Sequence, residues 1–157
     1  MWLAKGSMVE SIREFGTRDA SAQYVLRPGG YAVILREPQQ IAVVTTPLGR
    51  FLPGGGQEHD ETPDLAAIRE VREECGLSVR ILRAIGIADE LIYASVERTH
   101  FCKRCTFFLA EVTGVMSPEQ ADHCLSWVSI LDAAAYLHHR SQRWAVSEAC
   151  RIMGVAS

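Results

Sequence analysis

Three glutamates spaced three and four residues apart form the most suggestive chemical pattern in the chain. Glu70, Glu73 and Glu74 share an arc of about 100° on a helical wheel drawn at about 100° per residue. The glycine run 54–56 precedes them, and glycine lets the backbone approach a ligand that any Cβ would obstruct. Grouped carboxylate oxygens suit Mg²⁺ or Mn²⁺. The pattern therefore indicates a Mg²⁺ or Mn²⁺ site, with a solvated acidic helix face as the alternative.

The acidic residues of the chain are concentrated around this pattern. Seven of the nineteen fall within residues 58–74, where only Arg69 and Arg72 oppose them, although the net charge is only −3. The basic residues form no run, which argues against a nucleic-acid partner. An acidic segment in a nearly neutral protein favours a bound cation.

The residues from Gly55 to Leu77 resemble the Nudix box, the signature of the Nudix hydrolases. Glu61 follows Gly55 after five residues, and the segment 69–77 (Arg-Glu-Val-Arg-Glu-Glu-Cys-Gly-Leu) follows after seven more, so all nine fixed positions are present. The resemblance implies an α/β fold, namely an α/β/α sandwich with a mixed sheet in one domain over residues 1–157. It also implies metal-dependent hydrolysis of a nucleoside diphosphate linked to another group.

The same resemblance implies which residues hold the metal. Glu73 and Glu74 match the family's metal-binding pair, and the carbonyl of Gly54 is a further ligand. Glu70 matches a carboxylate that binds metal in some members and acts as the general base in others. Divalent ions neutralise a diphosphate and activate water, and a neighbouring carboxylate can accept the proton of that water.

Three further residues complete the expected catalytic group. Arg69 matches the arginine that orients the box glutamates, and Glu61 matches an acid that braces the loop against the helix. Family members often supply another acid from a loop beyond the box, for which Glu119 and Asp122 are the candidates. We favour Asp122 as a metal ligand, with an exposed loop acid as the alternative.

Substrate contacts are predicted on weaker signals. Arg36 and Arg50 are expected near the cleft, where their guanidinium groups suit substrate phosphates. Gly55 and Gly56 are expected to let the substrate approach the backbone. Tyr93 stands sixteen residues past Leu77, near the offset of a tyrosine associated with diadenosine polyphosphate hydrolases.

The substrate itself is left open by the sequence. Dinucleoside polyphosphates, nucleotide sugars, nucleoside triphosphates and diphosphoinositol phosphates all remain candidates, and a proline that often marks ADP-ribose-specific members is absent. The alternative function is a catalytically silent module with the Nudix fold that binds or senses a nucleotide.

The elements that must position these residues can be placed by local rules. Thr62 is expected as N-cap and Pro63 as the first residue of a helix that ends before Gly76. Its core face, opposite the glutamates, is expected to consist of Leu65, Ile68, Val71 and Cys75. His138 and His139 are expected on the surface of a later helix, pointing about 100° apart. The other expected elements are buried strands at 31–36 and 41–46 joined by a loop at 37–40, a loop at 47–56, β-rich stretches at 78–94 and 98–112, a short strand at 126–130, and helices at 132–137 and at 142–153, the last with Ser141 as N-cap.

Composition sets the remaining expectations. Apolar residues make up 48% of the 157 residues and charged residues 22%, which is typical of one globular domain. No apolar run reaches the length of a membrane span, so no membrane partner is expected, and five cysteines in an odd number favour the reducing cytoplasm. A homodimer is left open. Residues 1–21 are expected to be flexible or partly foreign to the natural chain, with Met8 as an alternative start.

Overall fold

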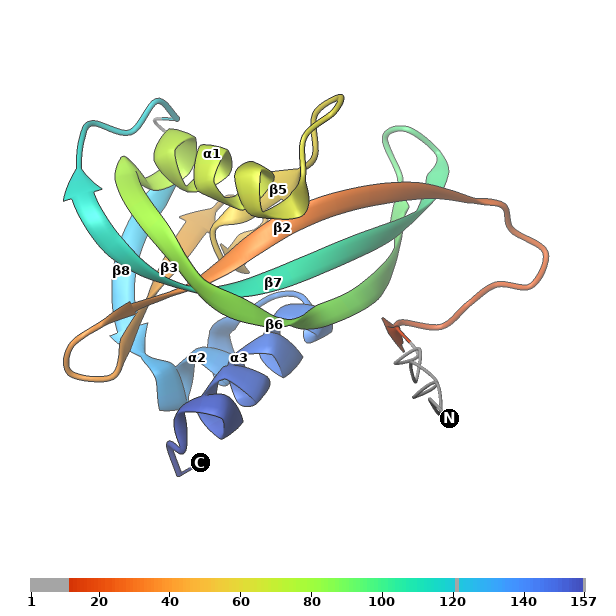
Figure 1. Cartoon of the computed structure of the whole chain (residues 1–157). Coiled ribbons are helices and arrows are strands. Elements are labelled where there is room, and N and C mark those ends of the chain that lie inside the picture. The colour runs from red at the N-terminus through yellow and green to blue at the C-terminus, as the bar shows by residue number, and fades with distance from the viewer. Residues whose placement is uncertain (1–11, 121, 157) are drawn as a thin grey trace, which may run out of the picture.

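The computed structural model describes residues 12–120 and 122–156 (Figure 1). Residues 1–11 lie outside the described part, so only 12–21 of the N-terminal segment can be placed, and they contribute one strand. In chain order the elements are β1 (Arg13–Phe15), β2 (Tyr24–Arg36), β3 (Gln40–Thr46), β4 (Gly49–Phe51), β5 (Gly54–Gly56), α1 (Pro63–Cys75), β6 (Leu77–Ala94), β7 (Thr99–Val115), β8 (Cys124–Ser129), α2 (Ile130–Tyr136) and α3 (Arg140–Met153).

Within the described residues, eight strands form one mixed sheet. Its order is β1-β6-β7-β2-β3-β4, with β5 also paired to β2 and β8 to β3. The β1–β6 and β2–β7 pairs are parallel, and the other pairs are antiparallel. Helix α1 covers one face and helices α2 and α3 cover the other (Figure 1). This arrangement confirms the predicted α/β/α sandwich with a mixed sheet.

Strand β2 supplies side chains to both layers of the core. Tyr31 and Val33 belong to the cluster formed with α2 and α3, while Ala32 and Ile34 belong to the cluster formed with α1. Successive side chains of a strand point to opposite faces, so a strand covered on both sides reads as a continuous apolar run. That run is the buried strand predicted at 31–36.

Helix α1 begins and ends where local rules place it. Thr62 is the N-cap, Pro63 is the first helical residue, and Gly76 ends the helix with a φ of 65°. A residue with a side chain is disfavoured in that left-handed conformation, which is why glycine commonly follows a helix.

The face that α1 buries is the predicted one in part: Val71 and Cys75 are buried, and Ile68 packs against their cluster. Leu65, expected in the core, is 52% exposed, whereas Ala66, Ala67 and Glu74 are buried. The buried face is therefore wider than predicted and includes part of the acidic arc. Small side chains on this face, and glycines on the strands beneath, make such a close contact possible.

Gly30 of β2 is the tightest of these contacts, and it gives a first prediction. A Cβ at position 30 would lie 1.8 Å from the carbonyl oxygen of Pro63, a backbone atom that cannot yield cheaply. We expect Gly30→Ala to lower the free energy of unfolding by about 2 kcal/mol or more, through overpacking. Chemical denaturation measures the change.

Gly56→Ala is the matched control for this experiment, since its Cβ would meet only the Pro28 oxygen, at an ordinary 3.9 Å. It should change the free energy of unfolding by no more than about 0.5 kcal/mol. Equal stability of the two variants would contradict the close packing of α1 on β2.

Several boundaries differ from those expected. Strand β2 begins at Tyr24 instead of residue 31, because its first half pairs with β7. The loop expected at 47–56 contains the short strands β4 and β5, and α3 begins at Arg140 with His139, not Ser141, as N-cap. No helix in the described residues is long and apolar enough to span a membrane.

Candidate active site

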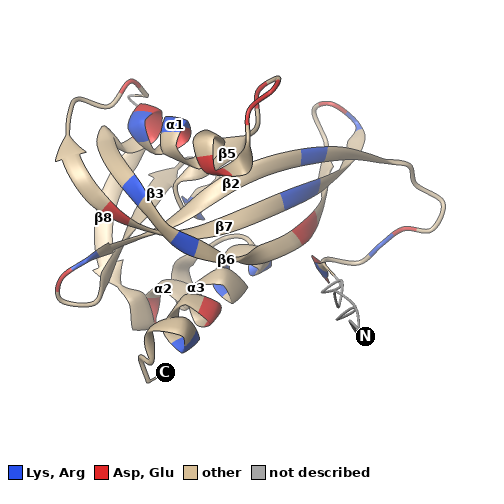
Figure 2. Cartoon of the chain, in the orientation of Figure 1, with Lys and Arg blue, Asp and Glu red and all other residues tan. Residues whose placement is uncertain are grey.

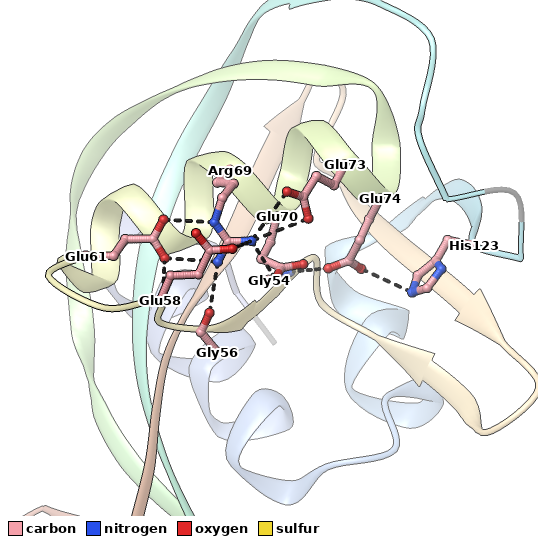
Figure 3. Close-up of polar contacts among 9 residues, drawn as sticks. All are labelled: Gly54, Gly56, Glu58, Glu61, Arg69, Glu70, Glu73, Glu74 and His123. Atoms are coloured by element: carbon pink, nitrogen blue, oxygen red, sulfur yellow. Dashed lines mark hydrogen bonds and ion pairs between the residues drawn. The ribbon is translucent and has the colours of Figure 1, made fainter.

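The box glutamates lie where α1 crosses β5 (Figure 3). Glu74 is only 6% exposed, and one of its carboxylate oxygens accepts a hydrogen bond of 3.3 Å from the Gly54 N–H. A Cβ at Gly55 would lie 2.6 Å from the carboxyl carbon of Glu70, so a side chain at this position would have to displace the Glu70 carboxylate. The glycine run and the helix thus form a single cradle.

The Arg69 guanidinium connects the remaining members of the box. Its Nε and Nη2 donate to the two carboxylate oxygens of Glu61 at 2.8 and 2.9 Å, and Nη2 also donates to the Gly56 carbonyl at 2.9 Å. Its Nη1 donates to Glu70 at 2.9 Å and lies 3.4 Å from Glu73. One side chain therefore fixes the β5 loop and two glutamates of α1 relative to each other (Figure 3).

The site carries more negative charge than its one arginine balances. Burial is the main reason that the pKa of Glu74 is raised from its ordinary 4.5 to about 8, and the carboxylates of Glu70 and Glu73 also raise it. The hydrogen bond from Gly54 acts in the opposite direction. A buried carboxylate in this state favours a proton or a cation, and hard oxygen donors match Mg²⁺ or Mn²⁺.

The carboxylates do not form a closed metal cage in this arrangement. Across the described ranges, no group of three or more His, Cys, Asp or Glu side chains is placed to hold a metal ion. Glu70 and Glu73 are turned toward Arg69, while Glu74 is held by Gly54. The donor set fits a hard divalent ion. Gly54 contacts Glu74 through its N–H group, whereas its carbonyl oxygen was the atom predicted as a metal ligand.

His123 is a residue of this site that sequence reasoning missed. Its Nε2 lies 3.8 Å from a carboxylate oxygen of Glu74 (Figure 3). Its Nδ1 lies 2.9 Å from a carboxylate oxygen of Asp122. Asp122 is 72% exposed and contacts His123, which stands between it and the box. No spacing rule indicates this, because the segment before β8 is brought to α1 by tertiary packing.

The site opens into a cavity of about 870 Å³, within the usual size range of ligand pockets. Its wall draws on both halves of the chain. The predicted site residues that line it are Gly54, Gly55, Gly56, Glu70, Glu74 and Asp122.

The other predicted substrate contacts lie elsewhere. Arg36 has its guanidinium 4.3 Å from the ring centre of Trp127, and that of Arg50 lies 5.0 Å from the ring centre of Tyr136. Each lines a separate, smaller cavity. Tyr93 is 56% exposed and is not part of the main cavity wall, whereas its neighbour Ile92 is.

Two other basic residues line the main cavity instead. Arg27 and Lys103 are register partners on the parallel strands β2 and β7. Figure 2 shows basic residues at neighbouring places on these two strands. Recognising them would have required the first half of β2, which carries no clear sequence signal of its own.

The prediction that His138 and His139 diverge on a helix is wrong. They lie between α2 and α3, and both line the main cavity. Their ring centres are 5.0 Å apart, and they lie 5.4 and 5.3 Å from the ring centre of Phe51. Helix α2 ends at Tyr136, so the two histidines lie in the segment that connects it to α3, with a bend at His138 and extended backbone at His139, and the helical wheel does not apply to them.

Known proteins resemble this chain in sequence and in fold. The model of the NUDIX domain family matches residues 19–149. Diphosphoinositol polyphosphate phosphohydrolase 3-alpha of Mus musculus is 32% identical over 91 residues, which cover 55% of this chain and 51% of that protein. The chain therefore spans about half the length of this curated relative.

Solved structures show the same fold. A NUDIX hydrolase from Nitrosomonas europaea superposes with a TM-score of 0.66 at 20% identity, over 81% of this chain and 90% of that one. An ADP-ribose pyrophosphatase from Streptococcus suis 89-1591 superposes with a TM-score of 0.59 at 22% identity, over 80% and 92% of the two chains.

Proposed function

The chain belongs to the Nudix family, and on that premise we propose that it is a metal-dependent pyrophosphohydrolase. The reaction is attack of water on phosphorus, which cleaves a phosphoric anhydride bond in a small phosphorylated substrate. The observation that carries this proposal is Glu74, a buried carboxylate beside Glu70 and Glu73 at the wall of a cavity large enough for a nucleotide.

Glu70, Glu73 and Glu74 would hold Mg²⁺ or Mn²⁺, with the Gly54 carbonyl and Asp122 as further candidate ligands. When bound, such an ion neutralises the diphosphate and makes a coordinated water acidic. Arg69, braced by Glu61, keeps two of the glutamates oriented.

The remaining groups of the cavity wall have separate proposed tasks. Glu70 is the candidate acceptor of the proton that the attacking water loses, since it lines the cavity next to Gly55. Arg27 and Lys103 would hold phosphate oxygens, and the backbone at Gly55 and Gly56 leaves room for them. His123, between Asp122 and Glu74, would keep that end of the site oriented.

A second prediction follows from the metal requirement. After treatment with a chelator and dialysis, turnover should fall to background, and Mg²⁺ or Mn²⁺ should restore it. The assay panel contains a dinucleoside polyphosphate, a nucleotide sugar, a nucleoside triphosphate and a diphosphoinositol phosphate, with phosphate release and chromatography of products as readouts.

Two results would contradict the proposed function. One is full turnover in chelator, and the other is no turnover of any compound with either metal. Thermal stabilisation by a nucleotide without product would instead favour the catalytically silent module, since a ligand that binds only the folded state raises the melting temperature.

A further inference from the structure

We propose that Phe51, His138 and His139 form a subsite that binds the planar base of a nucleotide substrate, and that Glu90 positions His139 within it. This inference rests on the proposed function, because it assigns part of the same cavity. It narrows the substrate class to nucleotides and sets aside phosphorylated inositols.

The three rings form a compact aromatic wall. Their centres lie between 5.0 and 5.4 Å apart, a normal range for packed aromatic rings, and all three side chains line the main cavity. Phe51 ends β4 three residues before Gly54, so the wall is covalently close to the box loop. A planar base can stack on such a wall because every base has a π-face.

Glu90 gives the wall a defined orientation. This residue of β6 is 7% exposed, and its Oε1 accepts a hydrogen bond of 3.0 Å from the Arg140 N–H. The same oxygen lies 3.3 Å from Nδ1 of His139. Because Nδ1 faces the carboxylate, Nε2 is the nitrogen left for a ligand, an arrangement that fixes a histidine ring elsewhere in proteins. In the described residues the second oxygen, Oε2, is buried without a hydrogen-bond partner.

Charge favours a base over a phosphate at this end of the cavity. Among the described residues, the Lys and Arg side chains that line the cavity are Arg27 and Lys103, from β2 and β7. An inositol ring with phosphates around it would need basic side chains on most of its sides. The wall instead has a buried carboxylate, Glu90, directly behind His139, which disfavours an anion there. A nucleotide matches both features, with its phosphates near the basic pair and its base on the rings.

Binding of metal-supported ligands without turnover tests this directly. Calorimetry in Mg²⁺ compares ADP, GDP, CDP and UDP with inorganic pyrophosphate, which has no base. Each compound is used as its methylene-bridged analogue, in which the P–O–P bond that the enzyme would cleave is replaced by P–CH₂–P. At least one nucleoside diphosphate should bind the wild type about 10-fold more tightly than pyrophosphate. Phe51→Leu and His139→Gln should remove about this advantage while leaving pyrophosphate affinity within about 2-fold.

Tyr24→Leu is the matched control, because Tyr24 also packs on a histidine, His100, at 5.3 Å, but outside the cavity. This substitution should change neither the affinity for nucleoside diphosphates nor the affinity for pyrophosphate. Equal weakening of pyrophosphate and nucleotide by the Phe51 and His139 variants would overturn the subsite, as would no weakening of either. These outcomes are independent of the assay panel, so loss of the subsite and loss of the hydrolytic function can be told apart.

The positioning role of Glu90 has its own test. Glu90→Gln should raise the nucleotide KM about as much as His139→Gln and leave kcat nearly unchanged, since the reacting groups lie on α1. The variant that combines Glu90→Gln and His139→Gln should have a nucleotide KM no higher than that of either single variant, because the two residues act as a unit. A lower melting temperature with an unchanged KM would show a merely structural role. Should Glu90→Gln fail to fold, Glu90→Asp allows the same comparison.

Discussion

Replacing Glu74 by glutamine is expected to lower turnover about 100-fold or more while making the metal-free protein more stable at neutral and alkaline pH. The substitution keeps the side-chain volume, and its amide oxygen can still accept the hydrogen bond from Gly54. It removes a charged oxygen donor from the proposed metal site. It also removes a carboxyl group whose ionisation is disfavoured by burial and by Glu70 and Glu73.

The sign of the pH effect follows from the raised pKa of Glu74. The unfolded chain loses this proton near pH 4.5, whereas the folded chain keeps it to about pH 8. Between these values the folded state binds more protons, so its free energy of unfolding falls as the pH rises. Glu74→Gln lacks this contribution and should show a flatter profile over the same range.

Denaturation in chelator at pH 5, 6.5 and 8, together with kinetics in Mg²⁺, measures both effects. Glu97→Gln, an exposed substitution in the turn between β6 and β7, should behave as wild type. Wild-type turnover of Glu74→Gln at limiting metal would show that α1 is not the catalytic centre. An unchanged pH profile of stability would contradict the buried charge.

Arg69→Ala should cause the second large loss of turnover. It removes every hydrogen bond that joins Glu61 and the Gly56 carbonyl to Glu70, so the β5 loop and α1 lose their common anchor. We expect turnover to fall by about 10- to 100-fold, as for residues that orient metal ligands. The free energy of unfolding should fall by about 1–3 kcal/mol, because the carboxylates lose their donors.

Arg69→Lys should recover only part of this loss, since one ammonium group cannot match the planar fork that contacts Glu61 and Glu70 together. Arg72→Ala provides the control, because Arg72 is an exposed arginine of the same helix. Steady-state kinetics and chemical denaturation are measured on all three variants. If Arg69→Ala and Arg72→Ala behave alike, the orienting role of Arg69 is wrong.

Features set by neighbouring residues could be predicted from the sequence. The ends of α1 depend on Thr62, Pro63 and Gly76, whose backbone preferences act locally. The buried part of β2 depends on its own apolar run. The motif likewise placed the glutamates on one helix, because a helix fixes the spacing of its own side chains.

Features set by distant partners could not be predicted in this way. Residues 25–28 of β2 are exposed and show no alternating pattern, and they are part of a strand because β7 lies beside them. Leu65 is exposed, whereas Ala67 is buried where Gly30 lets the helix lie close to β2. His123 and His138 reach the cavity through packing between segments far apart in the chain. The alternation of side chains along a strand does not say which face of the sheet meets the cavity. Arg36 was expected near the cleft, but its guanidinium packs on Trp127 instead.

The parallel pairing of β2 with β7 also bears on how the protein is made. Residues 24–35 must meet residues 100–111, so the centre of the sheet closes a long loop, and contacts of this kind slow folding. A nascent chain that has emerged as far as Leu77 carries the whole glutamate motif but lacks Lys103, His123 and His138. During synthesis the glutamate motif is therefore complete before the cavity can form. Until β7 has been made, the edge of β2 that pairs with it has no neighbouring strand.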